Sequence, residues 1–196
     1  MTAQIMVQRS NTQALVVVAA TAIALLIGWG LKGFVEGQTR DVTVEGIRAA
    51  VPAGWLVEQS SNSLLTGGTE NTGLVFTARD PLDPETRYLV SALPAAPDSD
   101  LAATAAFRNL QRAQDNLAYR MFEQSLVSLK GRDGYRVNFA FVDAARVDRA
   151  PVVYQGVDYY FAEGDQTIVV TLETTRPLET ALTAFRDFAA GVGLGE

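Results

Sequence analysis

Near its amino terminus the chain has one long apolar stretch, residues 10–31, which contains no Asp, Glu, Lys or Arg. The stretch includes the run LVVVAATAIALLIGWGL. An α-helix rises about 1.5 Å per residue, so a helix over this stretch is about 33 Å long and can cross the roughly 30 Å hydrocarbon core of a bilayer. The pattern therefore predicts one transmembrane helix, with the lipid bilayer as a partner of the protein.

A cleaved signal peptide is the alternative interpretation of this stretch. Arg9 is the only basic side chain before it, and it is longer than the roughly 7–15 apolar residues of a signal-peptide core. The sequence that follows it, KGFVE, contains no good small-residue cleavage site. We therefore expect an uncleaved anchor. The chain then divides into a short head (1–9), an anchor (10–36), a connector (37–41) and a domain (42–196).

The orientation of the anchor depends on two opposing signals. Arg9 and the α-amino group lie before the apolar stretch, whereas Lys32, Arg40 and Arg48 follow it. This balance is close to even and leans slightly against a domain on the outside. A very short head, however, suits a signal anchor that keeps its amino terminus inside. We expect a single-pass protein of the cell membrane, with a cytoplasmic amino terminus and an extracytoplasmic domain.

Within the domain, apolar residues alternate with polar ones in several short segments, as they do in strands with one buried face. The segments 135–141 and 168–172 show this alternation most clearly. Short turns at 131–134 and 163–165 predict antiparallel hairpins. The predicted strands are 42–51, 55–58, 74–78, 86–93, 119–129, 134–143, 152–162 and 166–174.

Two further segments have helical spacing. The first, residues 98–117, begins at an acidic cap, and we expect its apolar side to pack on the rest of the domain. That side comprises Ala103, Ala106, Phe107, Leu110, Ala113, Gln114 and Leu117, while Arg108, Asn109, Arg112, Asp115 and Asn116 populate the other side. The second helix begins at Pro177, carries Phe185 and Phe188 on its apolar face, and ends in a glycine-rich tail.

The order of these elements predicts the fold class. Strands, one helix, a meander of strands and a closing helix give an α+β domain, in which an antiparallel sheet is flanked by amphipathic helices. One transmembrane helix precedes this domain.

This order resembles the PsbP-like fold family. The matching features are a VPAGW turn at 51–55, a helix after the first strand group, a strand that begins Gly134-Tyr135, and a Gly164-Asp165 turn before the strand 167–172. The resemblance covers residues 42–194 and rests on the order of the features. It implies an α/β/α sandwich and a membrane-anchored relative of bacterial type.

The family resemblance implies binding and support. The family includes extrinsic subunits of a photosynthetic membrane complex, a eukaryotic protein that binds a small GTPase, and envelope proteins of bacteria. It offers no catalytic residues that could be assigned to positions of this chain. An integral anchor departs from the soluble relatives, and fold alone does not give function.

Composition excludes several kinds of chemistry. The chain has no Cys and no His, which removes disulfides, thiol nucleophiles, Cys/His zinc sites and histidine bases. Lys130, the only lysine of the domain, lies in an apparent turn with no activating base nearby. The formal net charge is −6, which does not suit nucleic-acid binding. We expect no enzymatic activity, no cofactor and no nucleic-acid partner.

Three features of the anchor are candidate functional features. Ala20, Ala24 and Gly28 are small residues four apart, a spacing that allows another membrane helix to approach closely. Trp29 and Lys32 are expected at the membrane interface. The sequence GWGLKG at 28–33 matches G-x-G-x-x-G, but it lacks the strand–turn–helix context of a dinucleotide site, so we assign it no nucleotide role.

Two candidate sites lie in the domain. Asp80, Asp83 and Glu85 could supply oxygen ligands to a cation, although prolines between acids more often shape a solvated turn. We assign no metal site. Neighbouring residues of a strand point to opposite faces, so among Tyr154, Tyr159 and Tyr160 one set belongs to the core and the other could face a partner. The core interpretation is favoured for these aromatics.

Two functions follow from these observations. The first is a non-enzymatic accessory or scaffold subunit that helps to assemble or stabilise a membrane protein complex through its anchor and its domain. Its partners are other membrane-protein subunits. The second is an independent envelope protein whose domain binds a small or lipidic ligand.

Overall fold

The computed structural model describes residues 14–29, 37–60, 73–95, 100–143 and 150–195. The chain divides into two compact units, Met1–Thr39 and Arg40–Glu196, which are considered separately. In the first unit, residues 14–29 are α-helical. The head (1–9), residues 10–13 and residues 30–36 lie outside the described residues. No helix among the described residues combines the length and the hydropathy that a membrane span requires.

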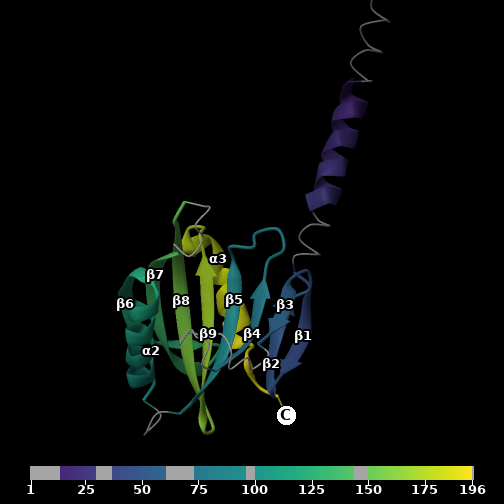
Figure 1. Ribbon diagram of the computed structural model, residues 1–196. Coiled ribbons are helices and arrows are strands. Elements are labelled where there is room, and N and C mark those ends of the chain that lie inside the picture. Colours follow the sequence, from purple (N-terminus) through teal and green to yellow (C-terminus); the bar gives the residue numbers. More distant parts are fainter. Residues whose placement is uncertain (1–13, 30–36, 61–72, 96–99, 144–149, 196) are drawn as a thin grey trace, which may run out of the picture. The chain divides into compact units, whose positions relative to one another are not determined.

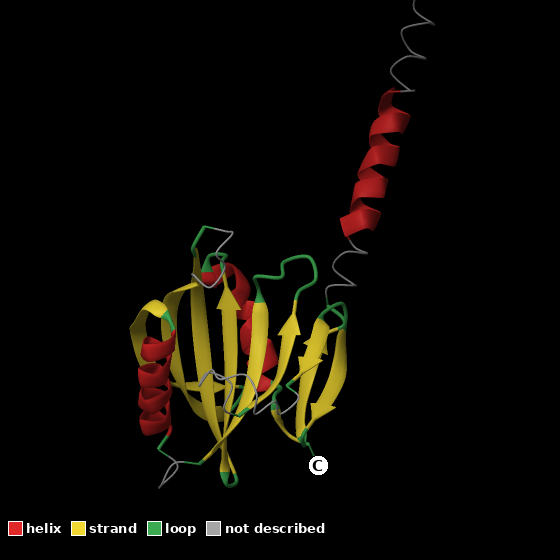
Figure 2. Ribbon diagram, in the orientation of Figure 1, coloured by secondary structure: helices red, strands yellow, loops and turns green. Residues whose placement is uncertain are grey.

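The second unit is built on a seven-stranded antiparallel sheet (Figures 1 and 2). Its strand order is β3-β4-β5-β9-β8-β7-β6. The strands are β3 (Leu56–Gln59), β4 (Leu74–Arg79), β5 (Arg87–Pro94), β6 (Leu117–Leu129), β7 (Arg132–Asp143), β8 (Val152–Glu163) and β9 (Gln166–Thr174). The predicted hairpins β6–β7 and β8–β9 are confirmed, since Leu129 pairs with Arg132 and Glu163 with Gln166.

A second, three-stranded sheet has the order β1-β2-β10, with β1 (Thr39–Val44), β2 (Ile47–Pro52) and β10 (Gly193–Leu194). The prediction of one strand over 42–51 is therefore wrong. Glu45 and Gly46, with φ values of 50° and 80°, turn the chain back on itself between β1 and β2. A turn with two positive φ angles matches the twist of a tight hairpin, and glycine adopts such angles without strain.

The two helices of the unit lie on opposite faces of the large sheet. Helix α2 (Leu101–Asp115) connects β5, inside the sheet, to β6 at its edge, and contacts β6, β7 and β8. Helix α3 (Leu178–Ala190) contacts β8 and β9 on the other face, and also β2 of the small sheet. The structure is thus α+β with antiparallel sheets, as predicted, but the face that carries α3 is also covered by a second sheet.

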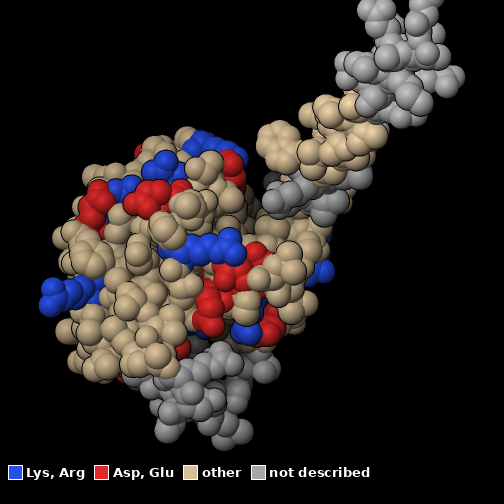
Figure 3. Space-filling view, turned by 90° about the horizontal axis from the view of Figure 1, so that it is seen from above, with Lys and Arg blue, Asp and Glu red and all other residues tan. Residues whose placement is uncertain are grey.

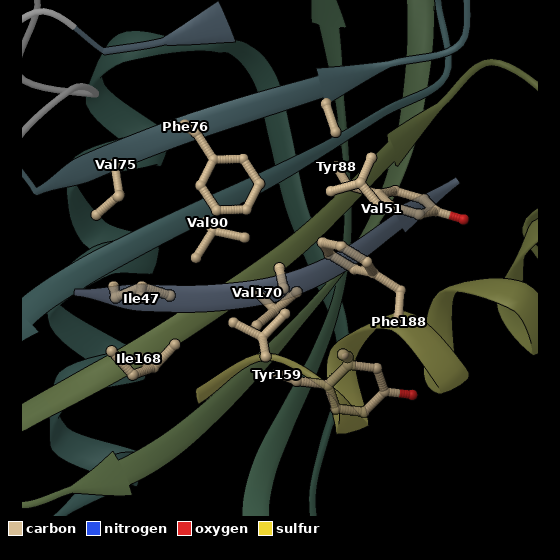
Figure 4. Packing of buried hydrophobic residues seen from close by; sticks show 14 of the residues in the cluster. Ile47, Val51, Val75, Phe76, Tyr88, Val90, Tyr159, Ile168, Val170 and Phe188 are labelled. Atoms are coloured by element: carbon tan, nitrogen blue, oxygen red, sulfur yellow. The ribbon is translucent and has the colours of Figure 1, made fainter. Parts of the chain in front are cut away.

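The main core fills the space between the large sheet, the small sheet and α3 (Figure 4). Tyr88 is at its centre, with ring centroids 4.4 Å from Trp55, 5.1 Å from Phe185 and 4.7 Å from Phe188. Such aromatic contacts add to the stabilisation from buried apolar area. The predicted apolar face of the closing helix, with Phe185 and Phe188, is confirmed as a buried face.

Gly156 of β8 marks a place where the backbone leaves no room for a side chain. A Cβ atom there would lie 2.3 Å from Cζ of Phe139 and 2.7 Å from the carbonyl oxygen of Leu172. We predict that Gly156→Ala lowers the free energy of unfolding by about 1–3 kcal/mol, because overpacking displaces the ring or the strand.

Gly54→Ala is the matched control, since nothing lies within 4 Å of a Cβ at that position. It should change stability by less than about 1 kcal/mol. Denaturant unfolding of the full chain in mild detergent measures both variants. Equal effects of the two substitutions would show that the approach of Phe139 does not restrict position 156.

Candidate functional site

The inward face of α2 is polar, contrary to the prediction from its sequence. Asn109 and Arg112 are buried beneath the helix together with Ala105. The side predicted to pack is exposed instead: Phe107 retains 64% and Leu110 60% of its accessible surface. All seven residues of the predicted packing side, 103, 106, 107, 110, 113, 114 and 117, are exposed. Helix formation was thus predicted correctly, and the buried side wrongly.

The reason for this inversion is Asp158 on β8. Its side chain is completely buried in the middle of the sheet, on the face that α2 covers. Its Oδ2 accepts hydrogen bonds from Nη1 of Arg112, at 2.6 Å, and from the hydroxyl of Tyr160, at 2.9 Å. Its Oδ1 accepts one from the hydroxyl of Thr171 at 2.6 Å. A buried carboxylate is tolerated only when it is paired and hydrogen-bonded in this way, and α2 supplies the cation.

Arg112 is held from two directions. Its guanidinium ion-pairs with Asp158 and also stacks over the ring of Phe139, 4.2 Å from the centroid. Burial is the largest single influence on the pKa of Arg112 and lowers it, but Asp158 together with neighbouring tyrosines and Glu173 raises it by more, so the pKa lies above its ordinary value. Arg112 is therefore a permanent cation. Its charge is matched inside the fold and is not offered to a ligand.

Neighbouring polar residues extend this buried centre toward the sheet edge. Asn109 accepts a hydrogen bond from the hydroxyl of Tyr119 and contacts Sδ of Met121 at 3.4 Å, which ties α2 to β6. Burial lowers the pKa of Arg108, and the like charge of Arg112 lowers it further. The Nε atom of Arg108 is buried and has no hydrogen-bond partner within the described part of the chain.

The chemistry available to this centre is structural. Asp158 accepts three hydrogen bonds, and the hydroxyls of Tyr160 and Thr171 are committed to it. Burial, followed by the charge of Asp158, raises the pKa of Tyr160 well above 10, so its hydroxyl stays protonated at neutral pH. A carboxylate that is hydrogen-bonded on both oxygens and shielded from solvent is poorly placed for acid–base or nucleophilic work. We therefore interpret the centre as a clamp for α2.

Sequence reasoning missed Asp158, although a signal for it was present. It interrupts the aromatic and β-branched run of β8, between Val157 and Tyr159. A lone acidic residue inside such a central strand requires a buried cation. Arg108 and Arg112, on the polar side of the helix predicted over 98–117, were the available candidates.

The acidic loop at Asp80, Asp83 and Glu85 uses its carboxylates within the fold. Asp80 accepts from the backbone N–H of Leu82 at 2.9 Å, and Asp83 ion-pairs with Arg176 at 2.7 Å. Glu85 accepts a hydrogen bond from the hydroxyl of Tyr154. No group of three or more acidic side chains able to hold a metal occurs in the described ranges.

The aromatic residues of β8 are core residues. Tyr159 and Tyr160 are fully buried, and Tyr154 is 5% exposed. Tyr159 packs against Phe161 and Phe185 on the α3 side, whereas Tyr154 stacks with Phe141 on the other side. Both faces of the strand are covered, so these tyrosines present no surface to a partner. The core interpretation favoured from the sequence is what the structure shows.

The anchor residues and Lys130 are also located by the structure. Ala20, Ala24 and Gly28 lie on the helix over 14–29, with nothing within 4 Å of a Cβ at Gly28. Trp29 is 80% exposed, and Lys32 lies outside the described residues. Lys130 occupies a turn with φ 51° and forms an exposed ion pair with Asp187 at 3.0 Å.

Charged side chains intermingle on the surface that Figure 3 shows, where Lys and Arg lie beside Asp and Glu. Examples elsewhere are the ion pairs Arg79–Glu58 and Arg132–Glu163. On the face in Figure 3 the basic side chains do not gather into a continuous stripe of the kind that phosphate backbones require.

No family model and no curated sequence matches this chain. Solved structures match its fold. Cyanobacterial PsbP (CyanoP) from Synechocystis sp. PCC 6803 has a TM-score of 0.59 at 13% identity, over 80% of this chain and 92% of the other. A protein from Bacteroides thetaiotaomicron has a TM-score of 0.52 at 10% identity, over 82% of this chain, which spans 49% of that protein.

A third similar structure is the Ran-binding protein Mog1p from Saccharomyces cerevisiae, with a TM-score of 0.47 at 12% identity, over 80% of this chain and 95% of the other. At these identities the comparisons show the fold alone. The domain has a PsbP-like fold, which confirms the resemblance inferred from the order of its elements.

The clamp interpretation predicts a large asymmetry between buried and exposed ion pairs. Arg112→Met should lower the free energy of unfolding by about 3–5 kcal/mol, because it leaves Asp158 buried without its cation. Arg48→Met is the control, because it breaks the ion pair of Arg48 with Asp41, in which the two side chains are 61% and 60% exposed. This variant should lower the free energy of unfolding by about 0–1 kcal/mol. Chemical denaturation of the full chain in mild detergent measures both. Comparable losses in the two variants would contradict the clamp.

Tyr160 makes the free energy of unfolding depend on pH in the alkaline range. Its pKa in the folded protein is raised above the value of about 10 expected in the unfolded chain. The folded state therefore holds this proton more tightly, so the stability it contributes is complete below about pH 10 and is lost as pH rises further. The free energy of unfolding should fall above about pH 10, and less steeply in Tyr160→Phe. The same slope in both proteins would exclude Tyr160 as a source of the pH dependence.

Proposed function

We propose that this chain is a non-enzymatic, single-pass membrane-anchored accessory subunit, which stabilises or helps to assemble a membrane protein complex. The observation that carries the proposal is the exposure of the helix over 14–29. Every one of its described side chains is exposed, including Leu15 at 71%, Leu26 at 70% and Trp29 at 80%. An apolar helix with such exposed side chains is suited to contact with lipid or with other membrane helices.

The non-enzymatic part of the proposal is supported by the domain. Its most buried ionic group, Asp158, is hydrogen-bonded on both oxygens to residues of the fold. The acids of the loop at 80–85 bind neighbouring groups of the same unit. The sequence has neither His nor Cys to act as base or nucleophile. A PsbP-like domain arranged in this way is suited to contact and support.

The orientation in the proposal follows from the sequence around the apolar stretch. We place the amino-terminal side of the stretch, where Arg9 is the basic side chain directly before it, in the cytoplasm. The domain is then extracytoplasmic and follows the anchor after a short connector. Its contact with the complex would add to the contact made by the anchor.

The small-residue face of the anchor is the proposed contact with other membrane helices. Ala20, Ala24 and Gly28 repeat every four residues, so they lie on one side of the helix and allow close backbone approach. Leucine at position 24 or 28 would hold a neighbouring helix away. A loss of about 1.4 kcal/mol at this contact corresponds to a tenfold weaker association.

This contact is tested by purification of the tagged full chain from its native membrane in mild detergent. Ala24→Leu and Gly28→Leu should each reduce the co-purified subunits by roughly tenfold. Ala22→Leu is the matched control, because residue 22 lies on the opposite side of the helix and should leave co-purification unchanged. Undiminished recovery with both test variants would contradict the helix contact. A chain recovered only with a bound small molecule would instead favour a ligand-binding envelope protein.

A further inference from the structure

The side of the domain formed by α2 and β6 exposes an unusual amount of apolar surface. We define the α2–β6 face by its six large exposed apolar side chains, which are Phe107 (64%), Leu110 (60%), Leu117 (62%), Met121 (44%), Phe122 (68%) and Leu126 (83%). Single exposed apolar residues are ordinary on protein surfaces. Six of them on two elements that contact each other indicate a site for a membrane or a protein partner.

The two elements of this face are joined directly. Asn109 of α2 contacts both Tyr119 and Met121 of β6, and Leu117 follows the helix after a single residue. Strand β6 is also the edge of the large sheet, as Figure 1 shows at the side where α2 lies. The helix and the edge strand are therefore neighbours, and each carries part of the α2–β6 face.

Besides the buried Arg112, two arginines, Arg108 and Arg120, and two acids, Asp115 and Glu123, belong to the elements of this face. Arg120, within β6, is exposed and makes no ion pair or hydrogen bond with the described residues. Arg108 has a buried Nε without an acceptor in that same part of the chain. Of the nearby acids, Glu123 is held by Arg136 and Asn138, and Asp115 has an interaction of its own. The unmatched charge thus calls for an anion.

We infer that the α2–β6 face rests on the lipid bilayer, with its apolar side chains at the headgroup–acyl boundary and Arg120 among anionic headgroups. The inference rests on the proposed anchor, which keeps the domain close to a membrane. The ten residues from the end of the helix at Trp29 to Thr39 can span at most about 35 Å, so the domain cannot leave the neighbourhood of the bilayer.

Lipid suits this face better than a protein partner does. The exposed side chains of α2 are mostly Ala, Phe and Leu, with Gln114 and Asp115 as the exposed polar ones. Such a surface offers few hydrogen bonds to a protein partner, whereas contact with acyl chains requires none. A second copy of the chain would bring the unmatched Arg120 of both copies into one interface.

The exposed edge of β6 is compatible with shallow contact. Interfacial segments bury their apolar side about 5–10 Å into the headgroup boundary. At that depth the tips of Phe122 and Leu126 reach the acyl chains, while the N–H and C=O groups of the strand stay among water and headgroups. Deeper burial would leave these groups without partners.

The experiment uses the absence of native cysteine. The full chain with Leu110→Cys carries an environment-sensitive NBD label and is placed at one copy per nanodisc, in lipid containing phosphatidylglycerol. Leu82→Cys is the control, since Leu82 is 93% exposed and lies outside the α2–β6 face. Phe122→Cys gives a second probe of the face.

Labels at 110 and 122 should emit at shorter wavelength than the label at 82, and brominated lipid should quench them at least about twice as strongly. Arg120→Gln should reduce that quenching in phosphatidylglycerol discs and not in phosphatidylcholine discs. If the labels at 110 and 122 emit as they do in water while the chain still resists alkaline extraction from the membrane, the inference about the α2–β6 face is wrong and the proposed anchor stands. Extraction of the chain would overturn the anchor itself. Protection that needs two copies per disc would replace lipid by a second copy.

Discussion

A carboxylate buried in the middle of the large sheet is the constraint on which the arrangement of this domain depends. Asp158 is completely buried, and a lone charge in such a place costs several kcal/mol. The fold offsets this cost with Arg112, which has to come from the element that covers that face of the sheet. Helix α2 is that element. Its rotation about its own axis is therefore set by an ion pair, and its apolar residues are not what bury it.

This constraint links the interior to the surface. Because the polar side of α2 faces the sheet, Phe107 and Leu110 face outward and join the exposed residues of β6. The same helix thus serves two purposes: its inner side neutralises the sheet, and its outer side is available for contact. On the opposite face of the sheet, α3 and the small sheet are held by apolar burial around Tyr88 and Phe185. The outward side of α2 is the surface on which the inferred bilayer contact rests.

The sequence predicts the strands and hairpins well because alternation and turn residues are strong local signals. Alternation locates β7 and β9, and the short turns after Leu129 and Glu163 identify the hairpins. The hairpin at Glu45 and Gly46 was missed because both sides of it have strand character. The pairing of β5 with β9 could not be predicted, since it joins residues about eighty positions apart and has no local signature.

The candidate site was harder to predict, for a physical reason. Helical periodicity assumes that the apolar side of a helix is the buried side, and α2 violates this assumption because of a charge on another element. Only the combination of Asp158 inside an aromatic strand and Arg112 on a polar helix side could have indicated it. Burial of Tyr154, Tyr159 and Tyr160 was the favoured interpretation and is what the structure shows, since both faces of β8 are covered.

The most direct test is whether removing the charge of Asp158 rescues the loss of Arg112. Asn at position 158 keeps an oxygen for Thr171 and is neutral, so Asp158→Asn in an Arg112→Met background removes both charges of the pair. The free energies of unfolding of the wild type, both single variants and the double variant form a cycle. The account predicts that the double variant is more stable than Arg112→Met alone, with a coupling of about 2 kcal/mol or more. Additive losses would contradict it, and would show that α2 is oriented by something other than this pair.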